Sequence, residues 1–189
     1  GDPTIETMND EEMERYWQAL DADKDRVGAA YLSIDLMTGI RKTALLKLEW
    51  KDIDFENKLI LLPGSKAKKG EFDTIPMTAD VEEVLRSLPH EEGARWVFPS
   101  PNDPSKPRES FRRTAERVKK AAGLPVNFRP IYCLRHTFAS RKIAAGVPLY
   151  VVADLLTNTP AAAQRYSHLL EETLRQAAEM GKTSRPVKK

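Results

Sequence analysis

The sequence predicts an α+β fold that is mainly helical, a multi-helix domain with one small three-stranded antiparallel sheet. Apolar residues recur at helical spacing over most of the chain, and the spacing becomes that of short strands only between residues 50 and 76. No regular alternation of strands and helices follows, which argues against a parallel sheet. With 189 residues, 41% of them hydrophobic, the chain is long enough for one domain and a short tail.

Several classes of protein are excluded by composition. No apolar run is long enough to cross a bilayer, so we expect no membrane partner. The single cysteine, Cys133, cannot form an internal disulfide, and with only three histidines it cannot complete a structural zinc site. We therefore expect a reducing, cytoplasmic setting and no metal. The opening Gly-Asp-Pro without a methionine suggests that a natural N-terminal portion precedes this sequence.

The first helices follow from apolar periodicity and from signals at their ends. Apolar residues recur at helical spacing over residues 13–20, behind an acidic run at 9–12 that suits the positive start of a helix. The same spacing recurs over 27–37, and Gly39 stands where a left-handed residue ends a helix. A further short helix is expected to begin at Arg41.

Three short strands are predicted next, over residues 50–54, 58–62 and 71–76. They are joined by a polar turn at 55–57 and by a Gly- and Lys-rich turn at 64–70. Short connections of this kind make neighbouring strands antiparallel.

The rest of the chain is predicted to be helical. Thr78 caps a helix that Pro89 ends, and residues 108–120 form a helix with a narrow apolar stripe and a basic face. The remaining helices are predicted over residues 130–146, 148–156 and 161–180, so that residues 1–180 form the domain and 181–189 form a flexible basic C-terminal tail.

Charge is strongly segregated along the chain, although the net charge is only +2. Residues 1–25 carry nine acids and two bases, whereas residues 106–142 carry eleven bases and two acids. Such an uneven distribution is typical of a surface that binds a polyanion. A solvated basic face without a ligand accounts for the charge alone equally well.

The spacing of the residues excludes several common kinds of functional site. The segment 21–25 begins like a calcium loop, but Arg26 stands where the turn requires glycine. The glycine-rich loops that hold nucleotide phosphates are absent, as are the motifs of serine hydrolases of the Gly-x-Ser-x-Gly type and of zinc proteases.

Cationic side chains at the starts of elements remain. Arg41 and Arg135 each lie at the beginning of a predicted helix, where an anion is favoured and where an arginine strengthens a phosphate site. Lys68 lies in the turn of the second hairpin, and Tyr166 lies on the last helix. Singly, each of these is more often an ordinary surface or half-buried residue.

Taken together, these residues belong to a recognisable order of motifs. Leu-Met-Thr-Gly-Ile-Arg at 36–41 is followed by a hairpin lysine eight residues before Pro76, by Leu-Arg-His-Thr-Phe-Ala-Ser at 134–140 and by Arg-Tyr-Ser-His at 165–168. Over nearly its whole length the chain resembles the catalytic domain of tyrosine recombinases, the phage integrase family.

The resemblance implies a catalytic set and a reaction. The family's two arginines, hairpin lysine and tyrosine correspond to Arg41, Arg135, Lys68 and Tyr166. It implies site-specific recombination, as in phage integration and excision, by cleavage and rejoining of DNA through a 3′-phosphotyrosyl intermediate without a metal or cofactor. The implied partners are double-stranded DNA, three further copies in a homotetramer on DNA and an accessory DNA-bending protein. The isolated chain is expected to be a monomer. An N-terminal DNA-clamping domain is expected outside this sequence, and the protein is expected to be bacterial or phage-encoded and nucleoid-associated.

Three positions depart from the family pattern. Tyr132 stands where the family usually has histidine, and Asn158 stands where it usually has histidine or tryptophan. Ala44 replaces an acid that usually supports the site. Tyr132 and Asn158 can still donate hydrogen bonds to a phosphate oxygen, and we include them in the catalytic set, but neither carries the charge of an imidazolium. These departures leave open a DNA-binding module with a degenerate catalytic site. A second alternative is DNA relaxation by a type IB topoisomerase, which also uses Tyr, Arg, Lys and His.

A set of basic side chains is expected to contact DNA phosphates, most of them on or near the predicted helix 108–120. This set consists of Lys42, Lys66, Lys69, Arg108, Arg112, Arg113, Arg117, Lys120, Arg129 and Lys142.

Overall fold

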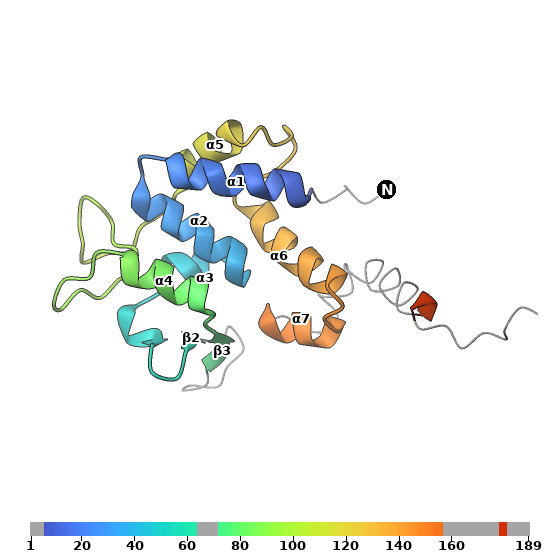
Figure 1. Ribbon diagram of the computed structural model, residues 1–189. Helices are drawn as coiled ribbons and strands as arrows, with labels where there is room; N and C mark the ends of the chain where they lie inside the picture. The colour runs from blue at the N-terminus through green and yellow to red at the C-terminus, as the bar shows by residue number, and fades with distance from the viewer. Residues whose placement is uncertain (1–5, 64–71, 157–177, 181–189) are drawn as a thin grey trace, which may run out of the picture. The chain divides into compact units, whose positions relative to one another are not determined.

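The computed structural model describes residues 6–63, 72–156 and 178–180 (Figure 1). The chain divides into two compact units, residues 1–138 and 139–189, and the boundary between them falls within a helix. The described part is mainly helical and contains a three-stranded antiparallel sheet, which confirms the predicted fold class.

Helix α1 (Asp10–Ala22) begins with a reciprocal cap. The side chain of Asn9 accepts a hydrogen bond from the Glu12 N–H at 2.8 Å, and the Glu12 carboxylate accepts one from the Asn9 N–H at 3.1 Å. Two of the otherwise unpaired donors of the first turn are satisfied in this way. The acidic run of the sequence therefore starts the helix as predicted.

Helix α2 (Arg26–Thr38) is capped by Asp25, which accepts a hydrogen bond from the Gly28 N–H at 2.9 Å. The second carboxylate oxygen of Asp25 accepts the hydroxyl proton of Thr114, which lies far along the chain. Gly39 has a φ of 67° and ends the helix, as the sequence predicts. Most residues of α2 are buried, so this helix lies inside the first unit.

The segment after α2 differs from its prediction. Helix α3 (Lys42–Leu46) is followed by a 3₁₀-helix, η1 (Trp50–Asp52), and strand β1 is only Ile53–Asp54. The strand predicted to begin at Trp50 is therefore mostly wrong. The Trp50 N–H donates to the carbonyl of Arg95 at 3.0 Å, so this stretch pairs with a distant loop instead of a strand.

The sheet has the order β1-β2-β3 with antiparallel neighbours, where β2 is Leu59–Pro63 and β3 is Phe72–Pro76. Ile60 of β2 lies opposite Ile75 of β3, and both side chains are buried. Strand β2 begins one residue later than predicted because Lys58 has a φ of 58°, a left-handed turn conformation that a strand does not accept.

Helix α4 (Ala79–Ser87) is capped by Thr78, whose hydroxyl accepts a hydrogen bond from a backbone N–H of the first turn. Helix α5 (Arg112–Ala121) is shorter than the predicted helix 108–120. The Arg108 N–H donates to the Phe98 carbonyl at 2.7 Å, which holds this residue in an extended loop ahead of α5.

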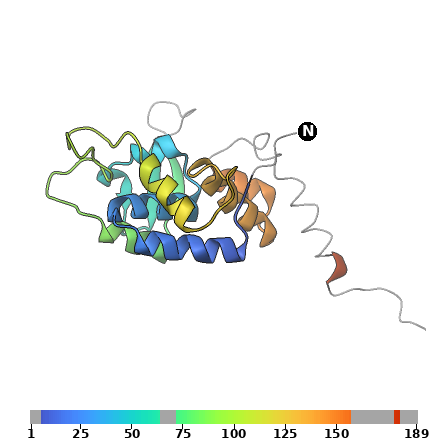
Figure 2. The same cartoon turned by 90° about the horizontal axis from the view of Figure 1, so that it is seen from above.

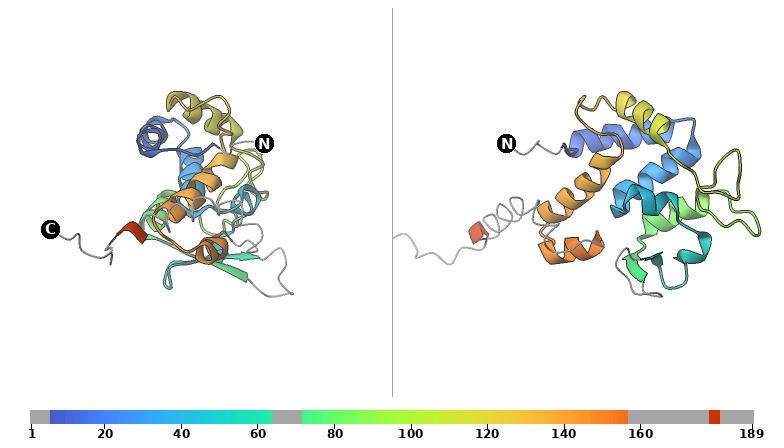
Figure 3. Two further views of the ribbon diagram at one scale, coloured as in Figure 1. Left: turned by 90° about the vertical axis from the view of Figure 1, so that its right-hand side faces the viewer. Right: turned by 180° about the vertical axis from the view of Figure 1, so that it is seen from behind.

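Within the first unit, α1 and α5 lie side by side at one end, and the sheet lies at the opposite end, as Figures 1 and 3 show. Figure 2, which views the unit from above, shows α5 in yellow beside α1 in blue. Helix α2 contacts α1, α4 and α5. Its Tyr31 ring meets Phe98 edge-on at 5.3 Å and Phe111 at 4.7 Å, so aromatic packing joins α2 to the loop before α5.

Helix α6 (Tyr132–Ala144) begins two residues after Pro130, which the sequence predicts as its first residue. Gly146, with a φ of 90°, follows its end. Helix α7 (Leu149–Leu155) has Pro148 as its N-cap, one position earlier than the helical position predicted for it.

The predicted helix 161–180 lies outside the described residues except at its last three positions, and the predicted tail 181–189 lies wholly outside them. Within the described ranges, no helix combines the length and the apolar character that a transmembrane span requires.

Candidate active site

The turn at Gly39 is bound by one predicted catalytic arginine and leads into another. The carbonyl of Gly39 accepts a hydrogen bond from Nη1 of Arg135, which is 96 positions away in the sequence. Arg41 follows two residues after Gly39 and is the N-cap of α3. The guanidinium of Arg135 in α6 is therefore bound to the turn from which the chain continues into Arg41, two residues further on.

Hydrogen bonds hold this turn in one conformation. The hydroxyl of Thr38 donates to the Ile34 carbonyl at 2.6 Å and accepts from the Ile40 N–H at 3.3 Å. The Gly39 N–H donates to the Asp35 carbonyl at 2.8 Å, and the Ile40 side chain is buried. The backbone that leads into Arg41 is thus held by hydrogen bonds and by burial of Ile40.

The helix that carries Arg135 is anchored from within the first unit. The hydroxyl of Thr137 donates to the Cys133 carbonyl at 2.7 Å and accepts a hydrogen bond from the Met8 N–H at 3.2 Å. Both Thr137 and the neighbouring His136 are buried. Hydrogen bonds of this kind hold the helix in place, so that the side chain of Arg135 projects from a fixed backbone.

Three side chains pack in a row at the start of α6. The guanidinium of Arg129 lies 3.6 Å from the centre of the Tyr132 ring, and that ring meets His136 edge-on at 4.3 Å. Tyr132 is 42% exposed. A guanidinium over an aromatic face is a favourable arrangement that also fixes both groups.

Four residues before Gly39, on α2, lies an acid that the sequence analysis did not select. Asp35 is 1% exposed, and neither carboxylate oxygen has a hydrogen-bond partner among the described residues. Burial raises the pKa of Asp35, and the positive charge of Arg135 opposes that rise. The signal in the sequence is an acid in the middle of an apolar helix, where a carboxylate is costly.

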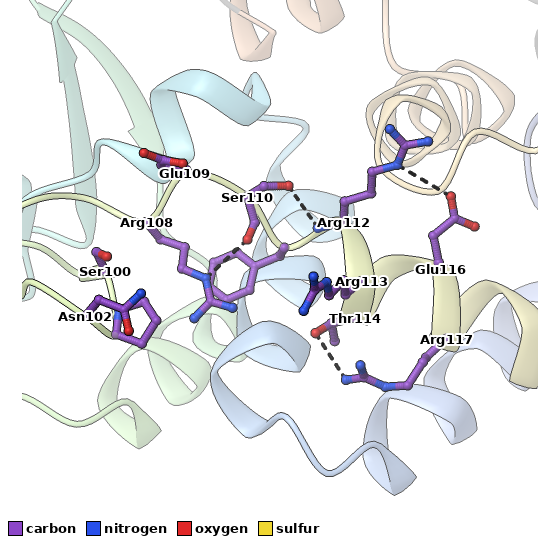
Figure 4. Close-up of a pocket in the computed structure, with 12 residues that line it drawn as sticks. Ser100, Asn102, Arg108, Glu109, Ser110, Arg112, Arg113, Thr114, Glu116 and Arg117 are labelled. Carbon is purple, nitrogen blue, oxygen red and sulfur yellow. Dashed lines mark hydrogen bonds and ion pairs between the residues drawn. The ribbon is translucent and has the colours of Figure 1, made fainter.

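A cleft of about 890 Å³ lies at the start of α5, and Figure 4 shows the side chains around it. Ten of the twelve residues that line it are polar or charged, four of them arginines. The lining residues are Ser100, Pro101, Asn102, Arg108, Glu109, Ser110, Phe111, Arg112, Arg113, Thr114, Glu116 and Arg117.

The arginines of this cleft differ in their contacts. The guanidinium of Arg113 has no hydrogen-bond or ion-pair partner within the described part of the chain, while that of Arg112 lies 3.8 Å from the Glu116 carboxylate. Arg108 stacks its guanidinium 4.5 Å above the centre of the Phe111 ring. Three cations with weak or no ionic pairing therefore surround a space that a phosphate group can enter.

Arg117 has a different environment from the other arginines of the cleft. It donates two hydrogen bonds to Asp23, at 2.9 and 3.1 Å, and a third to Thr114 at 3.2 Å. The hydrogen bond from Arg117 is the main reason that the pKa of Asp23 lies below its ordinary value. Arg117 therefore ties α5 to the loop between α1 and α2, a contact between distant segments that sequence spacing does not reveal.

The family model described as the phage integrase family matches residues 6–173. The chain belongs to the phage integrase family. It is 27% identical to a XerC-like tyrosine recombinase of Caldanaerobacter subterraneus, over 93% of this chain and 53% of that protein. The catalytic domain of bacteriophage HP1 integrase is similar in fold, with a TM-score of 0.68 and 21% identity, over 98% of this chain and 100% of that domain.

A larger solved structure is also similar in fold. It is the XerH site-specific recombinase bound to a palindromic difH substrate, which superposes with a TM-score of 0.75 at 22% identity, over 94% of this chain and 54% of that one. This integrase-family chain spans about half the length of the curated relatives it matches.

The structure describes half of the predicted catalytic set of this integrase-family domain. Arg135 bonds to the Gly39 carbonyl two residues before Arg41, and Tyr132 lies one helical turn before Arg135. Lys68, Asn158 and Tyr166 lie outside the described residues, as do the predicted DNA contacts Lys66 and Lys69.

The remaining predicted DNA contacts are described. Lys42 and Lys120 are exposed, and neither ammonium group has a partner among the described residues. Arg129 stacks on Tyr132, as given above, and Lys142 lies on the part of α6 that belongs to the second unit. Within the described ranges, no group of three or more His, Cys, Asp and Glu side chains is arranged to hold a metal ion.

Proposed function

We propose that this chain is the catalytic domain of a tyrosine recombinase, which cleaves and rejoins double-stranded DNA through a 3′-phosphotyrosyl intermediate. The observation that carries the proposal is the hydrogen bond of Arg135 to the Gly39 carbonyl, two residues before Arg41. Two guanidinium groups can present planar forks to the non-bridging oxygens of one phosphate. They stabilise the extra negative charge of a pentacoordinate transition state.

The other catalytic roles follow from the chemistry of the predicted residues. Tyr166 attacks phosphorus, so that a phosphotyrosyl bond forms as the bond to the 5′ oxygen breaks. Lys68, which is protonated at neutral pH, donates a proton to the departing 5′ oxygen. Since the covalent link conserves the phosphodiester, the reverse attack by a 5′ hydroxyl rejoins the strand without ATP.

Tyr132 and Asn158 serve in this proposal as neutral hydrogen-bond donors to the scissile phosphate. The exposure of Tyr132 and its place one helical turn before Arg135 support its role. A hydrogen bond to a charged group is worth about 1.5 to 3 kcal/mol. The enzyme is therefore expected to be slower than one with imidazolium groups at these positions, but active.

The basic groups at the start of α5 form the proposed DNA-binding surface, together with the basic residues that lie along this helix and before it. The lack of a partner for Arg113 and Lys120 among the described residues supports their assignment to phosphates. Arg117 stands apart, because its ion pair with Asp23 gives it a structural role. Charge reversal of Arg113 should weaken DNA binding, whereas Arg117→Ala should chiefly lower the stability of the domain.

Recombination is preferred to DNA relaxation because relatives similar in sequence to this chain are named as recombinases or integrases, among them a XerC-like recombinase and the integrase of Salmonella phage P22. We further propose that four copies assemble on two DNA sites, that an N-terminal DNA-clamping domain and a DNA-bending protein assist, and that the protein works on nucleoid DNA in the cytoplasm.

The test is covalent capture of a nicked suicide substrate. Because the short strand released by cleavage diffuses away, an active enzyme accumulates as a covalent adduct that is visible on a denaturing gel. Tyr166→Phe should abolish the adduct and leave DNA binding intact, since it removes only the attacking oxygen. DNA binding without any adduct in the unaltered chain would favour the degenerate DNA-binding module instead.

A further inference from the structure

The guanidinium of Arg129 makes the shortest contact between a cation and an aromatic ring among the described residues. It lies 3.6 Å from the centre of the Tyr132 ring, whereas the other three such contacts measure 4.1, 4.3 and 4.5 Å. Two of those other arginines also form ion pairs with glutamates at 3.0 Å. Arg129 has no carboxylate partner in the described part of the chain. Its positive charge is therefore not neutralised by an acid there.

The backbone of Arg129 is fixed to the first turn of α6. The Cys133 N–H donates to the Arg129 carbonyl at 3.1 Å, and the Arg129 N–H donates to Sγ of Cys133 at 3.2 Å. Cys133 is buried in the core of the first unit, so this reciprocal pair of hydrogen bonds ties residue 129 to that core. The exposed side chain of Arg129 thus starts from a backbone that is held at both its N–H and its carbonyl.

Two side chains hold the ring of Tyr132. Besides Arg129, the buried His136 meets this ring edge-on at 4.3 Å. These contacts restrict the rotamers of Tyr132, although the residue is partly exposed. Tyr132 and Arg135 are three positions apart on α6, and residues at this spacing are neighbours on the surface of a helix.

We propose that Arg129 is a positioning residue, which acts on the scissile phosphate through Tyr132. It holds the phenol ring in one orientation, and its positive charge strengthens the hydrogen bond that the phenol donates to an anionic phosphate oxygen. A donor oriented in advance needs no rearrangement as negative charge develops in the transition state. The inference rests on the proposed function, because it takes Tyr132 as a donor to that phosphate. It differs from a direct contact of Arg129 with DNA, which would not depend on Tyr132.

The first test is an NMR measurement on the full chain without DNA. The readout is the Hδ signal of Arg129, assigned through its disappearance in Arg129→Lys. Because the arginine lies over an aromatic ring, the ring current should shift this signal upfield, and Tyr132→Leu should return it toward the position of a free arginine. An unchanged signal would show that the stack does not form in solution, and it would overturn the proposal whether or not the chain cleaves DNA.

The second test is a double-mutant cycle on single-turnover cleavage of the suicide substrate at saturating protein. Arg129→Gln should lower the rate by about 2- to 5-fold, the rate equivalent of a cation–π contact at an exposed site. Arg129→Lys should recover part of this loss, because it keeps the charge. In a Tyr132→Leu background, Arg129→Gln should have no further effect, since the arginine acts through the ring. An equal loss in both backgrounds would show that Arg129 acts on DNA by itself and would overturn the proposal.

Arg86→Gln is the matched control, because it removes a guanidinium that lies over another aromatic ring of the same unit, that of Phe55. It should leave the cleavage rate unchanged. Arg129→Gln should melt close to the unaltered chain, since the side chain is exposed; a loss of folding would assign Arg129 a structural role and overturn the proposal. If the unaltered chain forms no covalent adduct, the proposed function fails and this inference fails with it. If the adduct forms but the two substitutions act independently, the inference alone fails.

Discussion

Replacement of Gly28 by alanine sets two physical effects against each other. A Cβ at this position would lie 2.4 Å from a carboxylate oxygen of Asp25 and 2.9 Å from Cγ2 of Thr114. Both distances are far below the separation of about 3.5 to 4 Å at which non-bonded atoms attract. The Asp25 side chain would have to move, and it would then lose its hydrogen bonds to the Gly28 N–H and the Thr114 hydroxyl.

The sizes of these effects predict the sign of the change. Loss of the N-cap of α2 costs about 1 kcal/mol, and overpacking between α2 and α5 costs about 1 to 3 kcal/mol. The higher helix propensity of alanine raises the free energy of unfolding by about 1 kcal/mol. Gly28→Ala should therefore lower the free energy of unfolding by about 1 to 3 kcal/mol, measured by urea denaturation followed by circular dichroism.

A second substitution identifies the source of the destabilisation. Thr114→Ser removes the Cγ2 atom and keeps the hydroxyl that bonds to Asp25, so Gly28→Ala should cost less in that background than in the unaltered chain. The coupling between the two sites should be about 0.5 to 3 kcal/mol, as for residues in contact. A Gly28→Ala protein as stable as the unaltered chain, or more so, would show that helix propensity outweighs packing here and would refute the reasoning.

Three further predictions concern DNA and chemistry. The double charge reversal Arg113→Glu and Lys120→Glu should weaken DNA binding and reduce its salt dependence by roughly 0.9 log unit per log unit of salt for each phosphate that the protein no longer neutralises; an unchanged slope in a titration series would remove α5 from the DNA surface. Tyr132→His should raise the cleavage rate, and the gain should decline as pH rises through about 6 to 7, where imidazole loses its proton; a gain independent of pH would contradict a charge effect. Lys68→Ala should recover most of its cleavage rate on a substrate whose 5′ bridging oxygen is replaced by sulfur, because a thiolate leaves without protonation; recovery by Lys69→Ala in its place would move the general acid by one residue.

Features governed by neighbouring residues could be predicted from the sequence. The acidic start of α1, the Thr78 cap of α4 and the end of α2 at Gly39 depend on residues within a few positions, and each was confirmed. The antiparallel sheet was confirmed for the same reason, since short turns leave little choice of partner. The family motifs supplied the order of the site residues, and the structure binds Arg135 to the turn that precedes Arg41.

Features that depend on distant segments could not be predicted. Trp50 forms part of a 3₁₀-helix because its N–H bonds to the carbonyl of Arg95, and no local pattern signals that contact. The pairing of Arg117 with Asp23 joins residues 94 positions apart, so the sequence offered Arg117 only as one more basic residue. Asp35 was visible as an acid in an apolar helix, but its relation to Arg135 required the fold. The roles of Lys68, Asn158 and Tyr166 stay predictions.

The hydrogen bond between Arg135 and Gly39 has a consequence for how this domain can diverge. Because the acceptor is a main-chain carbonyl, no exchange of side chain at residue 39 can delete it. What a mutation can change is the path of the backbone, and a φ of 67° makes every residue with a side chain less favourable there than glycine. Mutations around the turn can therefore change the side chains near Arg41 and Arg135, as the family's acid is replaced by Ala44. The carbonyl that binds Arg135 remains as long as the chain folds with this turn.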